Sequence, residues 1–128
     1  MSQPIKIVHV DDDEDILTLT KMSLEYFGNM AVSQFTSGQQ ALDNIDRVEP
    51  DLLLLDVMMP DIDGFTLLKK IRELPKFAGI EAIFMTAKAE MVSAERAREP
   101  GVLGMIVKPF DTPTLPQVIL DLWKKSER

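Results

Sequence analysis

The sequence predicts an α/β domain in which helices cover both faces of a parallel, doubly wound sheet of five strands. Short apolar segments, several of them rich in β-branched residues, alternate five times with segments whose apolar residues recur at helical spacing. The connections are short, and no linker or low-complexity segment interrupts them. Parallel strands need right-handed crossovers, and a helix after each strand supplies one.

The clearest strand is the run of four leucines at 52–55, which Asp51 precedes and Asp56 follows. An apolar run this short, bounded by polar and turn residues, is typical of a strand buried on both faces. A buried helix is the competing interpretation, but Pro50 and Pro60 leave too little length for one. We therefore expect a central strand that ends at Asp56.

The remaining strands are predicted from apolar segments that end at polar or turn residues. They cover residues 5–10, 30–35, 80–85 and 105–107. The five helices are predicted from apolar residues at helical spacing. They cover residues 16–27, 38–48, 65–74, 91–98 and 113–123, and the apolar face of the fourth is thin.

Capping residues set the limits of the first three helices. Asp13 and Ser37 are good N-caps for the first two helices, and Gly28 is a natural end for the first. Pro75 ends the third helix. The single histidine, His9, lies inside a predicted strand, where a core position is more common than a functional one.

The composition of the 128 residues fits one globular domain, which we expect to span residues 1–128. A formal net charge of −7 argues against direct binding to nucleic acid or to an anionic membrane surface. The chain has no cysteine, which excludes disulfides and thiolate chemistry. It shows neither a signal peptide nor a membrane-spanning run, so we expect a cytoplasmic protein.

Polar side chains follow four of the five predicted strands, at the edge of the sheet where the strands end. These residues are Asp11, Asp12, Asp56, Thr86 and Lys108. Crowded carboxylates repel one another, and a hard cation such as Mg²⁺ offsets that repulsion. A lysine ammonium and a threonine hydroxyl suit the oxygens of a phosphoryl group, and a carboxylate can act as a nucleophile. The edge therefore predicts phosphoryl chemistry beside a metal ion.

Four segments resemble the motifs of the receiver domain of bacterial two-component response regulators, of the stand-alone, chemotaxis-regulator-like kind. They read VDDDEDI at 10–16, LDVMMPDIDGF at 55–65, MTA at 85–87 and VKPF at 107–110. Their order and spacing match over essentially the whole chain, which makes the combination specific. The resemblance implies a flavodoxin-like (βα)5 fold with strand order 2-1-3-4-5.

The resemblance also implies a metal site. Asp12 and Asp56 match direct ligands of Mg²⁺, together with the backbone carbonyl of Met58. Asp11 matches the acid that holds the metal through water. Magnesium is therefore the expected cofactor.

Phosphoryl transfer is the implied reaction. Asp56 matches the residue that accepts a phosphoryl group from a sensor histidine kinase or a histidine phosphotransfer protein. Thr86 matches the hydroxyl that moves onto the acyl phosphate, and Lys108 matches the cation that contacts the phosphoryl oxygens. Lys108-Pro109 matches a peptide bond that is cis in the family. The implied function is a signalling switch that assists its own labelling, rather than an enzyme.

The expected output face is formed by the fourth helix, the fifth strand and the fifth helix, through which receivers contact a downstream protein or form a homodimer. Two positions here depart from the family pattern. Met105 stands where the family often has a switch aromatic, and Glu99-Pro100 interrupts the end of the fourth helix. Because methionine is flexible and apolar, an aromatic switch at this position is absent or altered.

Two other functions compete with this interpretation. An aspartyl-phosphate phosphatase would carry its nucleophile after the first strand, whereas the candidate here follows the third. A phosphorylation-independent adaptor would not need the complete set of site residues. The sequence is compatible with a whole protein and with one domain of a longer regulator.

Overall fold

The computed structural model describes residues 4–88 and 92–125. Its five strands form a single sheet in the order β2-β1-β3-β4-β5, with every neighbouring pair parallel. The strands are β1 Lys6–Val10, β2 Ala31–Phe35, β3 Leu52–Asp56, β4 Glu81–Thr86 and β5 Val102–Val107. Both the fold class and the strand order confirm the prediction.

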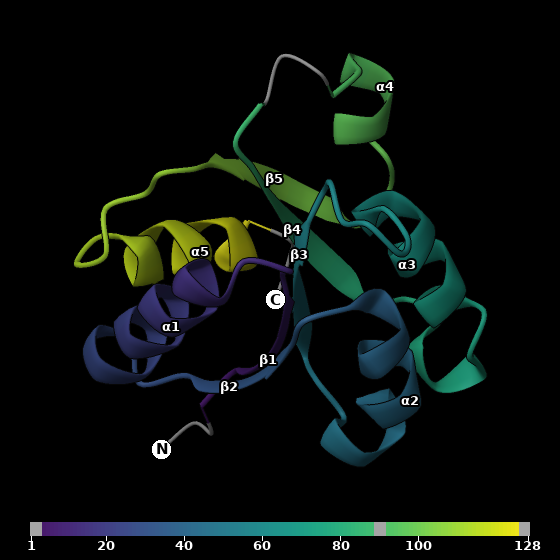
Figure 1. Cartoon of the computed structure of the whole chain (residues 1–128), viewed down its shortest axis with the longest axis horizontal. Helices are drawn as coiled ribbons and strands as arrows, with labels where there is room; N and C mark the ends of the chain where they lie inside the picture. Colours follow the sequence, from purple (N-terminus) through teal and green to yellow (C-terminus); the bar gives the residue numbers. More distant parts are fainter. Residues whose placement is uncertain (1–3, 89–91, 126–128) are drawn as a thin grey trace.

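Helices cover the two faces of the sheet in pairs (Figure 1). On one face lie α1 Glu14–Met22, which continues as the π-helix η1 Ser23–Phe27, and α5 Leu115–Lys124. On the other face lie α2 Gly38–Val48 and α3 Gly64–Arg72, followed by the short 3₁₀ helix η2 Pro75–Phe77. The four-residue α4 Ala94–Ala97 belongs to neither pair, and its Arg96 lies over the ring of Phe65 in α3.

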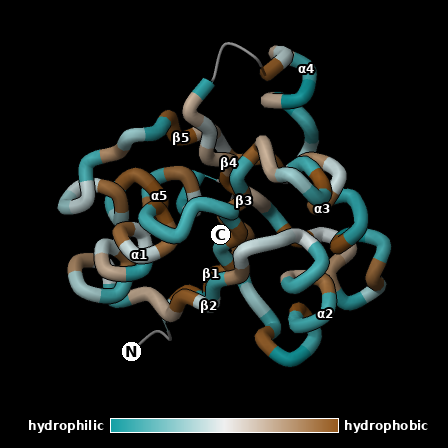
Figure 2. Tube along the Cα trace, viewed as in Figure 1, coloured by the Kyte–Doolittle hydropathy of each residue, from teal (hydrophilic) through white to brown (hydrophobic). Residues whose placement is uncertain are grey.

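The leucine run at the centre of the sheet explains why both faces are covered. Leu53 and Leu55 pack into the core under α2 and α3, while Leu52 and Leu54 face the core under α1 and α5. All four side chains are fully buried. The hydropathy of the chain follows this pattern, with apolar residues concentrated along the central strands (Figure 2).

The predicted caps are confirmed at both helices for which they were named. The side chain of Asp13 accepts hydrogen bonds from the N–H groups of Asp15 and Ile16, and the side chain of Ser37 accepts one from Gln40. Gly28 ends the first helical segment, because it is the C-cap of the π-helix η1. These local bonds fix where helices α1 and α2 begin, close to the edge that carries the acidic residues.

The fourth helix is shorter than predicted. We expected residues 91–98, of which Met91 lies outside the described residues, and the structure has α4 only over Ala94–Ala97. None of its four residues is buried, so no apolar face stabilises a longer helix. The chain then turns at Gly101, whose φ of 81° favours glycine.

Strand β5 is longer than predicted, since it begins at Val102 instead of residue 105. Gly104 interrupts the apolar pattern of the sequence but not the strand itself. Leu122 of α5 fills the space beside it, because a Cβ at position 104 would lie 2.9 Å from both Cδ atoms of Leu122. Helices α3 and α5 also differ by up to two residues from the predicted limits.

His9 is a core residue, as predicted, with no exposed surface. Its Nδ1 lies 3.2 Å from Nε2 of Gln34. Burial, and then the positive charge of Lys108, lower the pKa of His9 to about 3, so the ring is neutral. Among the described residues, no helix is both long and apolar enough to cross a membrane.

Candidate functional site

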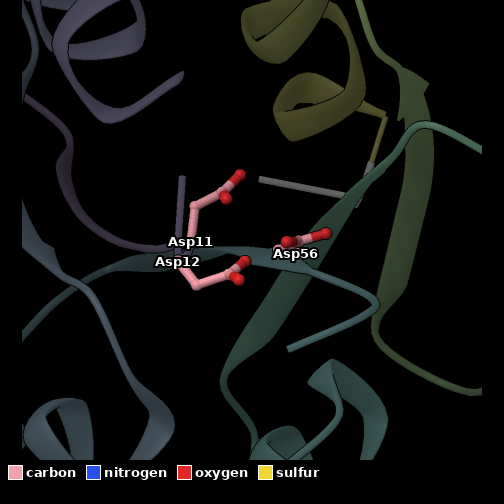
Figure 3. A group of neighbouring side chains, drawn as sticks. All are labelled: Asp11, Asp12 and Asp56. Carbon is pink, nitrogen blue, oxygen red and sulfur yellow. The ribbon is translucent and has the colours of Figure 1, made fainter. Parts of the chain in front are cut away.

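Three aspartates meet at the edge where strands β1 and β3 end (Figure 3). Asp11 and Asp12 follow directly after β1, and Asp56 is the last residue of β3. The register that pairs Val10 with Leu55 brings these residues next to each other. One carboxylate oxygen from each aspartate lies within 4.8 Å of the other two. The sheet therefore gathers acids that are 45 positions apart in the chain.

The three carboxyl groups differ in exposure. Asp11 is fully buried, and its Oδ1 accepts a hydrogen bond of 2.9 Å from the N–H of Asp13. Asp56 is 5% exposed, and its Oδ1 lies 3.4 Å from the N–H of Met58. Asp12 is exposed to solvent. The cluster thus has two acids held inside the protein and one at its mouth.

Lys108 places a positive charge between the two buried acids. It follows β5, and its side chain is only 12% exposed. Its Nζ lies 2.6 Å from Oδ2 of Asp11 and 3.4 Å from Oδ1 of Asp56. The peptide bond between Lys108 and Pro109 is cis, as the resemblance implied. Lysine and aspartates together form one site.

Burial and crowding change the protonation of Asp56. Desolvation, and then the negative charge of Asp11, raise the pKa of Asp56 to about 7, although Lys108 opposes this shift. Burial alone would lower the pKa of Lys108, but its bonds to Asp11 and Asp56 outweigh burial and raise it. With these shifts Lys108 is charged near neutral pH and Asp56 is only partly ionised.

The donor set fits a magnesium ion. Asp11, Asp12 and Asp56 offer oxygen ligands within a small space, and Mg²⁺ is held by few carboxylates with water and phosphate oxygens completing its shell. Burial, and then the negative charge of Asp11, disfavour the ionised form of Asp56, and a divalent cation bound there would favour it. Asp12 is exposed, so solvent reaches at least this one of the three carboxylates.

Thr86 and Met58 border the aspartates. Thr86 ends β4, next to β3 in the sheet, and is 2% exposed. Its hydroxyl accepts a hydrogen bond of 3.1 Å from the N–H of Lys88, and its carbonyl accepts one of 2.8 Å from the N–H of Lys108. Met58 is 57% exposed, and its backbone N–H lies 3.4 Å from Oδ1 of Asp56.

Residues of the connection between β3 and α3 support the site, although the sequence assigned Asp63 and Gly64 no role beyond their place in the motif at 55–65. The N–H of Gly64 donates to the carbonyl of Val57 at 2.9 Å, and a Cβ at position 64 would lie 2.3 Å from the carbonyl oxygen of Asp56. Only glycine allows this close approach. Asp63 caps α3 by accepting from the N–H of Thr66. Asp63 stands directly before an apolar helical pattern, and that spacing is the sequence signal for an N-cap.

Comparison with known proteins identifies the family. The family model described as the response regulator receiver domain matches residues 7–120. The transcriptional regulatory protein TrcR of Mycobacterium tuberculosis is 32% identical over 123 residues, which cover 96% of this chain and 47% of TrcR. An uncharacterized 14.6 kDa protein of Leptolyngbya boryana is 38% identical over 105 residues, covering 82% of this chain and 79% of that protein.

Solved structures agree with the sequence comparisons. A CheY-like response regulator receiver domain protein from Methanospirillum hungatei is 29% identical, with a TM-score of 0.78, covering 97% of this chain and 98% of its own. The chain spans about half the length of TrcR, the transcriptional regulator described above. The chain belongs to the response regulator receiver domains, the phosphorylation-activated signalling domains of two-component systems.

Proposed function

We propose that Asp56 accepts a phosphoryl group from a phosphohistidine of a sensor kinase or phosphotransfer protein, in a reaction that needs Mg²⁺. The observation that carries the proposal is the convergence of Asp11, Asp12 and Asp56, with Lys108 bonded to the two buried acids. A carboxylate oxygen of Asp56 forms the new bond to phosphorus, while the phosphorus–nitrogen bond breaks. The leaving imidazole takes up a proton from solvent.

Each neighbouring group has a proposed part in the transfer. Asp11, Asp12, Asp56 and the carbonyl of Met58 would hold the magnesium ion, directly or through water, and the bound ion would compensate charge on the phosphoryl oxygens. Lys108 would shift from the Asp11 carboxylate toward these oxygens, since its side chain already spans the space between the two acids.

Thr86 is the proposed sensor of the phosphoryl group. Its hydroxyl is buried, yet its bond to the N–H of Lys88 is a local contact within the same turn. An acyl phosphate on Asp56 would offer the hydroxyl a charged acceptor, which makes a stronger hydrogen bond than a neutral one. Movement of Thr86 would then shift the segment that follows β4.

The expected partner surface is the edge of the sheet at β5 with α4 and α5. β5 is the edge strand, and four of its six residues are half-buried while Val107 is 51% exposed. We propose that a downstream protein or a second copy of the chain binds there after phosphorylation. Four further expectations stay predictions from the sequence and the family. They are a single domain over residues 1–128, a cytoplasmic location, no direct binding to nucleic acid, and a role that is not enzymatic.

The proposal is tested by incubating the protein with acetyl phosphate in Mg²⁺ or in excess chelator and measuring the protein mass. We expect one phosphoryl group per chain with Mg²⁺ and none with chelator. Labelling that persists in chelator rules out the metal role. Steady turnover of small phosphate esters would favour a phosphatase, and a lack of response to beryllofluoride would favour an adaptor.

A further inference from the structure

The connection between β3 and α3 is attached to the first turn of helix α2. Oδ2 of Asp61 accepts a hydrogen bond of 3.1 Å from the N–H of Gln39. Next to it, Ile62 packs against Gly38, where a Cβ would lie only 2.8 Å from Cγ1 of Ile62. One charged and one apolar contact therefore join this connection to a helix that is not its neighbour in sequence.

Asp61 acts as a second cap for α2. The hydroxyl of Ser37 accepts a hydrogen bond of 3.2 Å from the N–H of Gln40, and the carboxylate of Asp61 accepts one from the N–H of Gln39. The carboxylate also faces the positive end of the helix dipole. Its slight burial alone would raise the pKa of Asp61, but backbone N–H groups, among them those of Gln39 and Gly38, outweigh it and lower the pKa.

The first residues of the same connection, Val57 and Met58, lie beside the aspartate cluster. The N–H of Met58 lies 3.4 Å from Oδ1 of Asp56, and Gly64 donates to the carbonyl of Val57 at 2.9 Å. Asp61 is only three residues beyond Met58. The backbone at Met58 therefore lies between two attachments. Its own N–H is near Asp56 and the neighbouring Val57 is bonded to Gly64, while Asp61 is bonded to α2.

We propose that Asp61 is a positioning residue for the cation site, because its bond to α2 sets the place of the Met58 backbone carbonyl. This inference rests on the proposed function, which assigns that carbonyl to the magnesium ion. Mg²⁺ tolerates little departure from octahedral geometry, so a small shift of one ligand weakens binding. The proposed role is indirect, because the group of carboxylates within ligand distance of one another that the described residues form consists of Asp11, Asp12 and Asp56.

The test measures the Kd of Mg²⁺ by calorimetry for matched variants, at a temperature where melting curves show each to be folded. We expect Asp61→Ala to bind Mg²⁺ about three- to tenfold more weakly, below the roughly 10–100-fold effect of residues that contact a metal ligand directly, because Asp61 acts on Met58 across three residues of backbone. Asp61→Asn keeps an acceptor oxygen and should lie between Asp61→Ala and the wild type.

Two further variants test whether Asp61 affects Mg²⁺ binding through the position of the connection or through its negative charge. Gly38→Ala leaves the charge unchanged but pushes against Ile62, so it should also weaken Mg²⁺ binding. Asp46→Ala removes an exposed acid from the far end of α2 and should bind like the wild type within about twofold. If Gly38→Ala does not fold, Ile62→Ala serves as the neutral variant that removes the same contact.

The outcomes are distinct. Wild-type affinity in both Asp61→Ala and the neutral variant overturns the proposal. Weakening in Asp61→Ala with wild-type affinity in the neutral variant, or equal weakening in Asp61→Ala and Asp46→Ala, assigns the effect to charge and also overturns it. A wild-type protein that binds no Mg²⁺ contradicts the proposed function instead.

Discussion

The ammonium nitrogen of Lys108 lies 2.6 Å from the buried carboxylate of Asp11, although 97 positions separate the two residues in the chain. This contact joins the ends of β1 and β5, which are not neighbours in the sheet. Lys108 is 3.4 Å from Asp56, so the lysine is shared between a closer and a more distant acid. The proposed phosphoacceptor is thus left with the weaker of the two ion pairs.

Replacing Lys108 should slow phosphoryl transfer to Asp56 without weakening the binding of Mg²⁺. Lys108→Met removes the charge but keeps much of the apolar stem, so we expect labelling by acetyl phosphate to slow by about tenfold or more. Mg²⁺ should bind at least as tightly as in the wild type, because a competing cation has left Asp11 and Asp56. Stopped-flow labelling and calorimetry measure the two effects, and an equal loss of both would argue against this division of roles.

Asp12 should be needed for metal binding but not for folding. Its side chain is exposed, so Asp12→Ala should change the melting temperature little and weaken Mg²⁺ binding by about tenfold or more. Asp15→Ala is the matched control, since it removes an exposed acid from the start of α1. Indistinguishable Mg²⁺ affinities for the two variants would exclude Asp12 as a ligand.

The raised pKa of Asp56 predicts how stability depends on pH in chelator. The pKa of this carboxyl is about 7 in the folded protein and about 3.9 in an unfolded chain. The folded state therefore binds the proton more tightly, so the stability that Asp56 contributes is fully present only below about pH 3.9 and is lost as pH rises through 7. Denaturant unfolding of the wild type and Asp56→Asn across this window measures the difference.

We expect Asp56→Asn to gain stability relative to the wild type as pH rises from 4 to 7, because the asparagine does not ionise. Saturating Mg²⁺ should reduce this difference, since the ion compensates the ionised carboxylate. Parallel stability curves for the two proteins in chelator would show that Asp56 is not perturbed in the folded state.

Gly64 should be the least replaceable glycine near the site. A Cβ there would lie 2.3 Å from the carbonyl oxygen of Asp56, so Gly64→Ala must move backbone and should cost about 1–3 kcal/mol of unfolding free energy. Gly79→Ala is the control, because nothing lies within 4 Å of its Cβ position. Chemical denaturation compares the two, and equal stabilities would refute the close approach.

The sequence was sufficient to predict the parallel sheet and the meeting of the aspartates, whereas the strand order came from the resemblance to receiver domains. This succeeded because the leucines at 52–55 could be buried only in a central strand, and because parallel strands deliver the residues after them to one edge. The capping roles of Asp13 and Ser37 are local, so sequence spacing alone revealed them.

Features that depend on tertiary contacts were not predictable from the sequence. Because of Gly104 the sequence predicted a start of β5 that is too late. The leucine that fills the space beside this glycine comes from α5, far along the chain. The bond from Gln39 to Asp61 joins a helix to a loop 22 positions away, and no periodicity marks it. Met105 was recognised as a departure, but only the register shows that it pairs with Phe84, whose ring stacks on Phe65.

The most direct test of the account is the phosphoryl content of wild type and Asp56→Asn after treatment with acetyl phosphate and Mg²⁺, read by intact mass and peptide mapping. We predict one phosphoryl group on the wild type, mapped to Asp56, and none on the variant. Undiminished labelling of Asp56→Asn would contradict the central claim.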